Sequence, residues 1–189
     1  VGAIAMTQKV MDTVYNRMDR AVVHGSTFAK NNLAMAAGLA TLHVMAEEKL
    51  VENSAVMGAD IITALNAMSS KYEFLKEARG KGMMIAIEFQ SPKSLKLKAA
   101  WAMLEAANKG LFCQMVTIPL FKDHRILTQV AGHGMNVVKL LPPLVLTQKD
   151  RDHIVSSFDK VIAETHHIPG SIWDLGKNLA SHALKGKSK

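Results

Sequence analysis

The hydrophobic positions along the chain predict four long helices. Residues 33–46 are apolar nearly all round, which is typical of a helix buried in a core or an interface. Across residues 51–65, apolar side chains recur at three- and four-residue steps, so an amphipathic helix is expected. Residues 95–108 have helical composition, and Lys109-Gly110 supplies a cationic last turn and a left-handed stop.

The fourth helix is predicted by the residues that would cap it. Thr147 and Asp150 resemble a capping box in which Asp replaces the usual Glu or Gln. We expect this helix to end near His166 and His167, because Pro169-Gly170 follows at once. Its buried stripe would consist of Ile154, Phe158, Val161 and Ile162.

Short apolar runs predict strands. Residues 1–6 and 21–23 are candidates for buried strands of a parallel sheet. Arg79-Gly80-Lys81-Gly82 is expected to form a turn with a structural role, and residues 83–89 a buried strand. Three further runs have strand composition: 111–118, 125–130 and 137–141. This order favours an α/β class, with a mixed or antiparallel sheet covered by helices.

Composition and charge exclude several classes of protein. With 49% hydrophobic and 21% charged residues, the sequence is typical of a soluble globular protein. No apolar run approaches the ~20 residues that cross a bilayer, and no leader is evident, so we expect a cytoplasmic protein without a membrane partner. The net charge of +7 is partly concentrated in the C-terminal lysines. Without a basic stripe interleaved with aromatics, nucleic-acid binding is not expected.

Cysteine and histidine offer little chemistry. Cys113 is the only cysteine, so no intrachain disulfide is possible, and its apolar surroundings predict a core residue rather than a nucleophile. The histidines lack the carboxylate and cysteine neighbours of a usual metal site, whether His124 with His133 or His166 with His167. We therefore predict no metal site.

A candidate phosphate site lies at residues 24–28, His-Gly-Ser-Thr-Phe. Glycine lets a ligand approach the backbone, and Ser26 and Thr27 provide hydroxyl donors. Asn31 or Asn32 can cap the helix that follows, and the free amides at a helix start attract an anion. The alternative interpretation is that Ser26 and Thr27 only cap a helix.

Several segments, in order, resemble the class III (ω-amino acid type) pyridoxal-phosphate-dependent aminotransferases. The resemblance spans about residues 1–166 and is carried by four motifs: Val1-Gly2-Ala3; residues 24–28 with Asn31, Leu33 and Ala34; Arg79 to Ile85 with Glu88-Phe89; and Lys139-Leu140-Leu141-Pro142-Pro143-Leu144. It implies the C-terminal part of a dimeric fold-type-I transferase. Residues 1–48 would end the large cofactor domain, 49–166 would form the small domain, and 167–189 would be an appended basic tail that Ile172 and Trp173 attach to the body.

The same resemblance implies roles for individual residues. Thr27, with Ser26, would contact the phosphate of pyridoxal 5'-phosphate held by the partner subunit of a homodimer. The family's Schiff-base lysine lies shortly before the equivalent of Gly2-Ala3, and the chain starts at Val1, too late to contain it. We therefore expect no catalytic residue here, weak cofactor binding and no transamination by these 189 residues alone.

Lys139 departs from the family pattern, which often has arginine before the Pro-Pro-Leu motif. An arginine fork holds a carboxylate with two hydrogen bonds, whereas lysine offers a point charge. Lys139 is thus a candidate substrate-binding residue, and the alternative is that it contacts only solvent or a neighbouring acid.

Three hypotheses about function remain open. The first is a transaminase that moves an amino group between an amine or amino acid and an oxo acid. The second is a decarboxylase, racemase or aminomutase on the same scaffold. The third is a non-catalytic module that self-associates through its apolar faces, above all residues 33–46.

Overall fold

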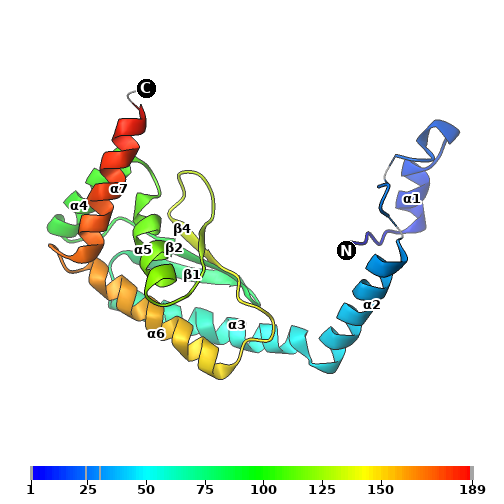
Figure 1. Cartoon of the computed structure of the whole chain (residues 1–189), viewed down its shortest axis with the longest axis horizontal. Helices are drawn as coiled ribbons and strands as arrows, with labels where there is room; N and C mark the ends of the chain where they lie inside the picture. The colour runs from blue at the N-terminus through cyan, green and yellow to red at the C-terminus, as the bar shows by residue number, and fades with distance from the viewer. Residues whose placement is uncertain (1, 24, 30, 188–189) are drawn as a thin grey trace. The chain divides into compact units, whose positions relative to one another are not determined.

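The computed structural model describes residues 2–23, 25–29 and 31–187. The chain divides into two compact units, Val1–Lys49 and Leu50–Lys189. The first unit contains α1 (Gln8–Val14), the 3-10 turn η1 (Met18–Arg20) and α2 (Asn32–Glu47). The second contains α3 (Leu50–Ala67), η2 (Met68–Ser70), β1 (Leu75–Lys81), β2 (Met84–Phe89), α4 (Leu95–Ala107), α5 (Leu111–Lys122), β3 (Gln129–Val130), β4 (Val137–Leu140), α6 (Gln148–Thr165) and α7 (Ser171–Lys187) (Figure 1).

The two strands predicted for the first unit do not form in its described residues. Residues 2–7 are irregular and residues 21–23 form turns and a bend, all of them exposed, so the predicted strands at 1–6 and 21–23 are wrong for the described residues. A parallel strand needs a neighbouring strand to satisfy its backbone groups, and the described part of this unit contains none.

The predicted helix at 33–46 is confirmed as α2, which Asn31 caps by accepting a hydrogen bond from the Ala34 amide at 3.0 Å. None of the residues of α2 is buried within the chain. The side chains of Leu39 and Leu42, for example, are 59% and 62% exposed. The apolar surface that the sequence assigns to a core or an interface is therefore uncovered here.

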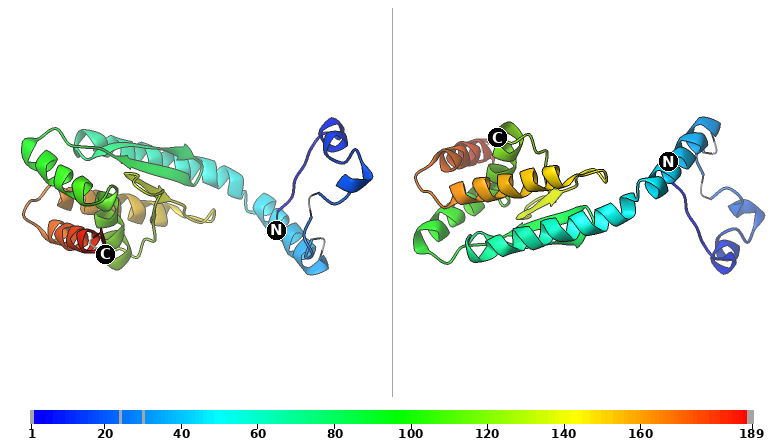
Figure 2. Two further views of the ribbon diagram at one scale, coloured as in Figure 1. Left: turned by 90° about the horizontal axis from the view of Figure 1, so that it is seen from above. Right: turned by 90° about the horizontal axis from the view of Figure 1, so that it is seen from below.

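The second unit is built on a four-stranded sheet of order β1-β2-β4-β3, in which all neighbours are antiparallel. Ile85, Ile87, Val138 and Leu140 lie on one face and are buried in the main core. α3 runs alongside β1, and α5 contacts β3 and β4 (Figures 1 and 2). The predicted antiparallel sheet covered by helices is confirmed, and so is the class.

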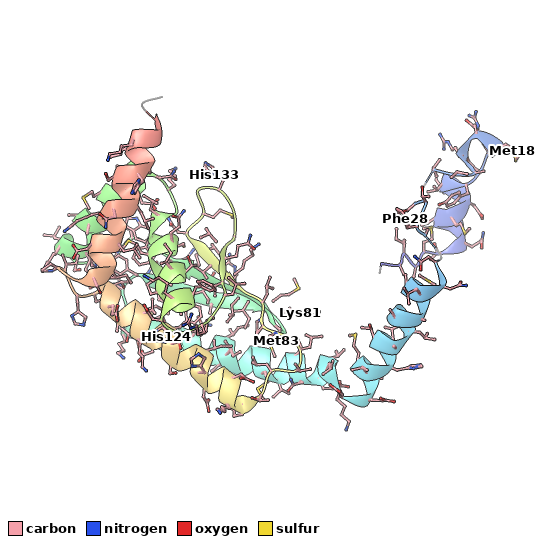
Figure 3. The ribbon with its side chains drawn as sticks, viewed as in Figure 1. Met18, Phe28, Lys81, Met83, His124 and His133 are labelled. Atoms are coloured by element: carbon pink, nitrogen blue, oxygen red, sulfur yellow. The ribbon has the colours of Figure 1, made fainter. Side chains whose placement is uncertain are left out.

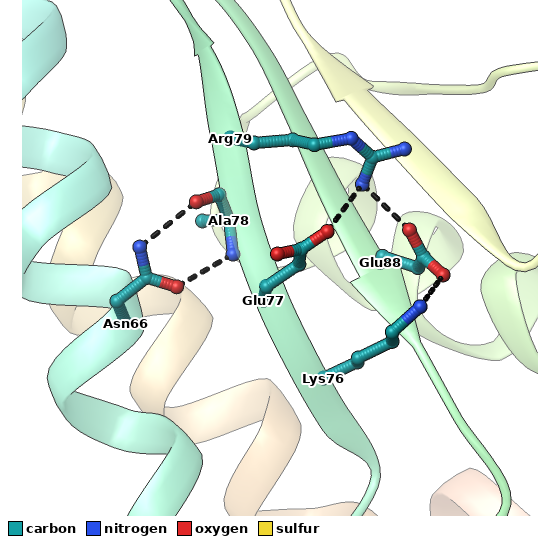
Figure 4. Close-up of polar contacts among 6 residues, drawn as sticks. All are labelled: Asn66, Lys76, Glu77, Ala78, Arg79 and Glu88. Carbon is teal, nitrogen blue, oxygen red and sulfur yellow. Dashed lines mark hydrogen bonds and ion pairs between the residues drawn. The ribbon is translucent and has the colours of Figure 1, made fainter.

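The free edge of β1 is covered by a side chain. Asn66 of α3 donates its amide to the carbonyl oxygen of Ala78 at 2.8 Å, and its own Oδ1 accepts the Ala78 amide at 2.7 Å (Figure 4). The side chain thus replaces the backbone of a missing neighbouring strand. Such covering protects a sheet edge from pairing with another chain.

Two predictions for the second unit are wrong. The turn falls at Gly82-Met83, because β1 continues to Lys81 and pairs it with Met84. Residues 111–118 form the first part of α5, not a strand. Gly110, at φ 84°, is the N-cap of α5. The residues of α5 are buried nearly all round, so their sequence has the same continuous apolar pattern as a buried strand. Of the predicted strand at 125–130, only Gln129–Val130 forms.

The signals predicted for the remaining helices form at α6 but not at the end of α4. α4 ends at Ala107 with the extended Asn108 as its C-cap, so the predicted cationic last turn does not form, and the left-handed Gly110 starts α5 instead of ending α4. α6 starts with a complete capping box between Thr147 and Asp150. α7 lies beside α4 and α5 (Figure 1), and Ile172 and Trp173 are both buried, as predicted. Residues 171–187 thus belong to the packed body of the second unit.

Asp159 joins α6 to the segment between η2 and β1 and gives the fold an acid-sensitive contact. The buried Tyr72 donates its hydroxyl to Asp159 at 2.7 Å, and this hydrogen bond, with Lys71 at 3.1 Å, lowers the pKa of the Asp159 carboxyl. A lowered folded-state pKa stabilises the fold above the unfolded value of about 3.9, and this contribution is lost as the pH falls through the folded-state pKa.

We therefore expect Asp159→Asn to cost about 0.5–1 kcal/mol at neutral pH, discounted for the half-exposed side chain, and progressively less as the pH falls below about 3.9. Urea denaturation at neutral pH and at a series of acidic pH values measures this. Tyr72→Phe is the matched variant, because it removes the same hydrogen bond and leaves Lys71 in place. A cost of Asp159→Asn that does not change with pH would contradict the assignment.

Candidate functional site

The predicted phosphate loop forms a turn just before α2. The Ala29 amide donates to the Ser26 carbonyl oxygen at 2.9 Å, and the Phe28 amide donates to Ser26 Oγ at 3.3 Å. Ser26 is thus engaged in holding the turn. His24 and Lys30 lie outside the described residues.

Thr27 is the residue of this turn that remains available. Its side chain is exposed and its hydroxyl has no hydrogen bond within the described chain, while a methyl group at Gly25 would meet nothing within 4 Å. The turn therefore offers a hydroxyl group and open space beside the start of α2. At that helix start the Ala34 amide is already bonded to the Asn31 side chain. These features fit the phosphate end of a cofactor and supply no group for its ring.

Lys139 lies on the sheet face opposite the core. In the register of the sheet it stands between Ala86 of β2 and Gln129 of β3, so the three side chains share that face. Lys139 and Gln129 line an open hollow of about 360 Å³ with Leu127, Thr128 and Leu141. No carboxylate lines this hollow, so Lys139 is its only charge among the described residues.

Sequence reasoning missed Gln129 and Thr128. Gln129 is the cross-strand neighbour of Lys139, and the buried Oγ1 of Thr128 has no hydrogen-bond partner in the described part of the chain. Together they can present polar groups to a carboxylate, with leucine on either side. The signal that could have found Gln129 is the hairpin register, which needs the true start of β3.

Two of the three cations of β1, Lys76 and Arg79, form ion pairs with glutamates of the sheet. Glu88 Oε1 lies 2.6 Å from Lys76 Nζ, and Glu88 Oε2 lies 2.6 Å from an Arg79 nitrogen, which also lies 3.2 Å from Glu77 (Figure 4). The hydrogen bond from Lys76, followed by the charges of Lys76 and Arg79, lowers the pKa of Glu88. Arg79 is therefore neutralised within the sheet, in agreement with its expected structural role.

Among the residues that the structure describes, Cys113 and the histidines do not form a site. Burial raises the pKa of the Cys113 thiol to about 12, which suits a core residue and not a nucleophile. His133 lies in the β3–β4 loop and His124 just after α5 (Figure 3). His166 accepts the Glu73 amide at Nε2, at 3.0 Å, and its Nδ1 lies 3.1 Å from the Ile162 carbonyl oxygen. Within the described residues, no three His, Cys, Asp or Glu side chains could jointly hold a metal ion.

No helix within residues 2–187 as described is long and apolar enough to span a membrane.

Comparison with known proteins identifies the family. The profile of the class-III aminotransferases matches residues 1–162. An alanine–glyoxylate aminotransferase 2 homolog of Arabidopsis thaliana is 30% identical over 159 residues, which is 84% of this chain and 30% of that protein. The acetylornithine aminotransferase of Elizabethkingia anophelis is 30% identical with a TM-score of 0.55, over 75% of this chain and 32% of that one. The ornithine aminotransferase of Toxoplasma gondii, at 26% identity, has a TM-score of 0.62 over 83% and 32% of the two chains.

Each of these relatives is more than three times as long as the part of it that this chain matches. The chain covers 21%, 30% and 27% of three curated relatives. The chain thus has the fold of a part of the fold-type-I pyridoxal-phosphate-dependent transaminases. The chain belongs to the class-III aminotransferase family.

Proposed function

We propose that this chain is the C-terminal portion of a transaminase that moves an amino group between an amine or amino acid and an oxo acid. The observation that carries the proposal is the exposed, unpaired hydroxyl of Thr27, in a turn that falls within the family match. The cofactor would supply the electron sink for the reaction. Residues 1–48 would end the large domain, 49–166 would form the small domain, and 167–189 would be added to it.

Ser26 and Thr27 are proposed to serve the phosphate of pyridoxal 5'-phosphate in the partner subunit of a homodimer. The exposed apolar side chains of α2, among them Leu39 and Leu42, support a subunit contact there. The same surface favours self-association of the isolated chain, which is the second candidate function. Sedimentation of the purified chain tests both, and a monomer at high concentration would count against them.

The test of the proposed function compares two proteins. A full-length enzyme containing this chain should bind the cofactor covalently, with a visible absorption band, and transfer an amino group to an oxo acid. The 189 residues alone should do neither, because the family's lysine lies upstream of the equivalent of Gly2-Ala3. A decarboxylated, racemised or rearranged product from the full-length enzyme would favour the other reactions of this scaffold.

Thr27 can be tested separately in the full-length enzyme. Loss of a hydrogen bond to a charged phosphate costs about 1.5–3 kcal/mol, so Thr27→Val should weaken cofactor binding by at least about tenfold. Thr27→Ser keeps the hydroxyl and should bind nearly as the parent does. Equal affinities of the two variants would remove Thr27 from the phosphate site.

Lys139 is proposed to bind a substrate carboxylate. Removing its charge with Lys139→Ala should raise the Michaelis constant of the oxo acid by about tenfold, since a hydrogen bond to a charged group is worth about 1.5–3 kcal/mol. Lys139→Arg should retain most of the affinity. An unchanged Michaelis constant in the alanine variant would place Lys139 outside the substrate site.

The proposed location is cytoplasmic. The lone Cys113 cannot form an intrachain disulfide, which suits a reducing compartment. We propose no nucleic-acid or membrane partner for this portion of the enzyme.

A further inference from the structure

Asn53 of α3 holds the turn that follows β4. Its side-chain amide donates to the carbonyl oxygen of Leu144 at 2.7 Å and to that of Leu146 at 3.0 Å. The Leu146 amide in turn donates to the Pro143 carbonyl oxygen at 3.1 Å, which closes the turn. One side chain of α3 thus fixes a turn whose bonded carbonyl groups come 91 and 93 residues later in the chain.

A stiff segment joins this turn to the hollow that Lys139 lines. Pro142 and Pro143 each have a φ that is fixed by the proline ring, and a residue before a proline is confined to extended conformations. Leu141 and Pro142 both precede a proline, so the chain from Leu141 to Pro143 has little freedom to bend. A displacement of the turn is therefore carried to Leu141 instead of being absorbed on the way.

Leu141 forms a wall of the hollow beside Lys139. Side chains two positions apart on an extended chain point to the same side, and both of these residues line the hollow. The Leu141 side chain is 59% exposed, so packing in the core does not fix its position. Its position depends on the backbone on either side, which is β4 before it and the two prolines after it.

We propose that Asn53 is a positioning residue for substrate binding in the hollow that Lys139 lines. By fixing the turn after the two prolines, the Asn53 amide sets how close Leu141 stands to the carboxylate that Lys139 would bind. Without this amide, two carbonyl oxygens lose their donor, and the turn moves to expose them to water. The inference rests on the proposed function, because a substrate carboxylate in this hollow belongs to that proposal.

A second polar contact of α3 supplies a matched control. Asp60 lies seven residues after Asn53, on the same face of the helix, and its Oδ1 accepts a hydrogen bond from Arg151 at 3.0 Å. This ion pair joins α3 to the first turn of α6 instead of to the turn after β4. Asp60→Asn therefore weakens a polar contact of α3 without releasing the turn that Asn53 holds.

The first experiment needs no catalysis and uses the 189-residue chain with labelled leucine methyl groups. NMR spectra should show that Asn53→Ala shifts the methyl signals of both Leu144 and Leu141. The Leu146 amide should exchange with solvent about tenfold faster, because its turn opens more often. Asp60→Asn should leave all three signals unchanged. If Asn53→Ala does not fold, Asn53→Ser, which keeps a single donor, should give smaller changes in the same direction.

The second experiment uses the full-length enzyme and separates kcat from the Michaelis constant. Asn53→Ala should raise the Michaelis constant of the oxo acid by about fivefold and change kcat by less than about twofold, because it weakens binding and leaves the reacting groups in place. A merely structural role would lower the amount of folded enzyme and leave the Michaelis constant unchanged. Added to Leu141→Ala, Asn53→Ala should raise the Michaelis constant no further, since both substitutions disturb the same wall.

Two kinds of result would overturn the proposal. A Leu141 methyl signal that stays in place while that of Leu144 moves would show that the two prolines do not transmit the displacement. An unchanged Michaelis constant in Asn53→Ala, or additive effects of Asn53→Ala and Leu141→Ala, would show that Asn53 does not act through this wall. A full-length parent enzyme that transfers no amino group would instead remove the proposed function, and the NMR spectra would still decide whether Asn53 positions Leu141.

Discussion

Trp173→Ala is expected to lower the free energy of unfolding of the second unit by about 3–5 kcal/mol. The Trp173 side chain is 2% exposed, and its ring centroid lies 6.1 Å from that of Phe74 in the aromatic cluster of the core. Its indole Nε1 donates a hydrogen bond to the Thr165 carbonyl oxygen at 2.9 Å. The substitution therefore leaves a cavity and removes the contact that joins α7 to the end of α6.

Chemical denaturation followed by far-ultraviolet circular dichroism measures this loss. Tryptophan fluorescence is less suitable, because the substitution removes one of the two tryptophans and leaves only Trp101 as a probe. Trp173→Phe separates the two contributions. It fills most of the volume but leaves the Thr165 carbonyl without its donor, so a loss of about 1–2 kcal/mol is expected. Lys177→Ala, exposed on the same helix, is the control and should change stability by less than about 0.5 kcal/mol.

A stability of Trp173→Ala close to that of the parent chain would mean that α7 contributes little to the core. Residues 171–187 would then be a detachable tail. The result expected here instead makes α7 an integral part of the second unit, even though the family match ends at residue 162.

The sequence predicts elements well where the signals are local. The capping box at Thr147 and Asp150 and the Asn31 cap each depend on a few neighbouring residues, and both form. Gly110 is left-handed as predicted, but it starts α5 instead of ending α4. Residues 111–118 fail because a helix buried on all sides has no amphipathic period, so its pattern equals that of a buried strand. α5 also contains Pro119, although proline usually ends a helix.

The candidate site was predictable only in part. Thr27 and Lys139 could be named from motifs, because a motif depends on residue type and order. Gln129 could not, because its relation to Lys139 depends on the pairing of β3 with β4, and only two residues of the predicted strand 125–130 actually pair. A residue that acts through a cross-strand contact leaves no local signal in the sequence.

Gly58→Ala is expected to destabilise the second unit by about 2–4 kcal/mol, although alanine is the better helix former by about 1 kcal/mol. Gly58 lies in α3, and a methyl group at this position would overlap the backbone carbonyl of Gly82 in the β1–β2 turn. The turn is held against α3, because the Met83 amide donates to Ser54 Oγ at 3.0 Å. Relief of the overlap therefore requires movement of the hairpin and loss of that hydrogen bond.

Gly176→Ala is the matched variant, since Gly176 also lies inside a helix and its new methyl group would also meet a close neighbour. That neighbour is the end of the Met115 side chain, which can change rotamer, whereas the Gly82 carbonyl belongs to the backbone. Gly176→Ala should therefore stay within about 1 kcal/mol of the parent chain. If Gly58→Ala proved as stable as Gly176→Ala in chemical denaturation, the hairpin would be free to move away from α3. The contact of Ser54 and Gly58 with the turn could then no longer explain how α3 positions the sheet face that carries Lys139.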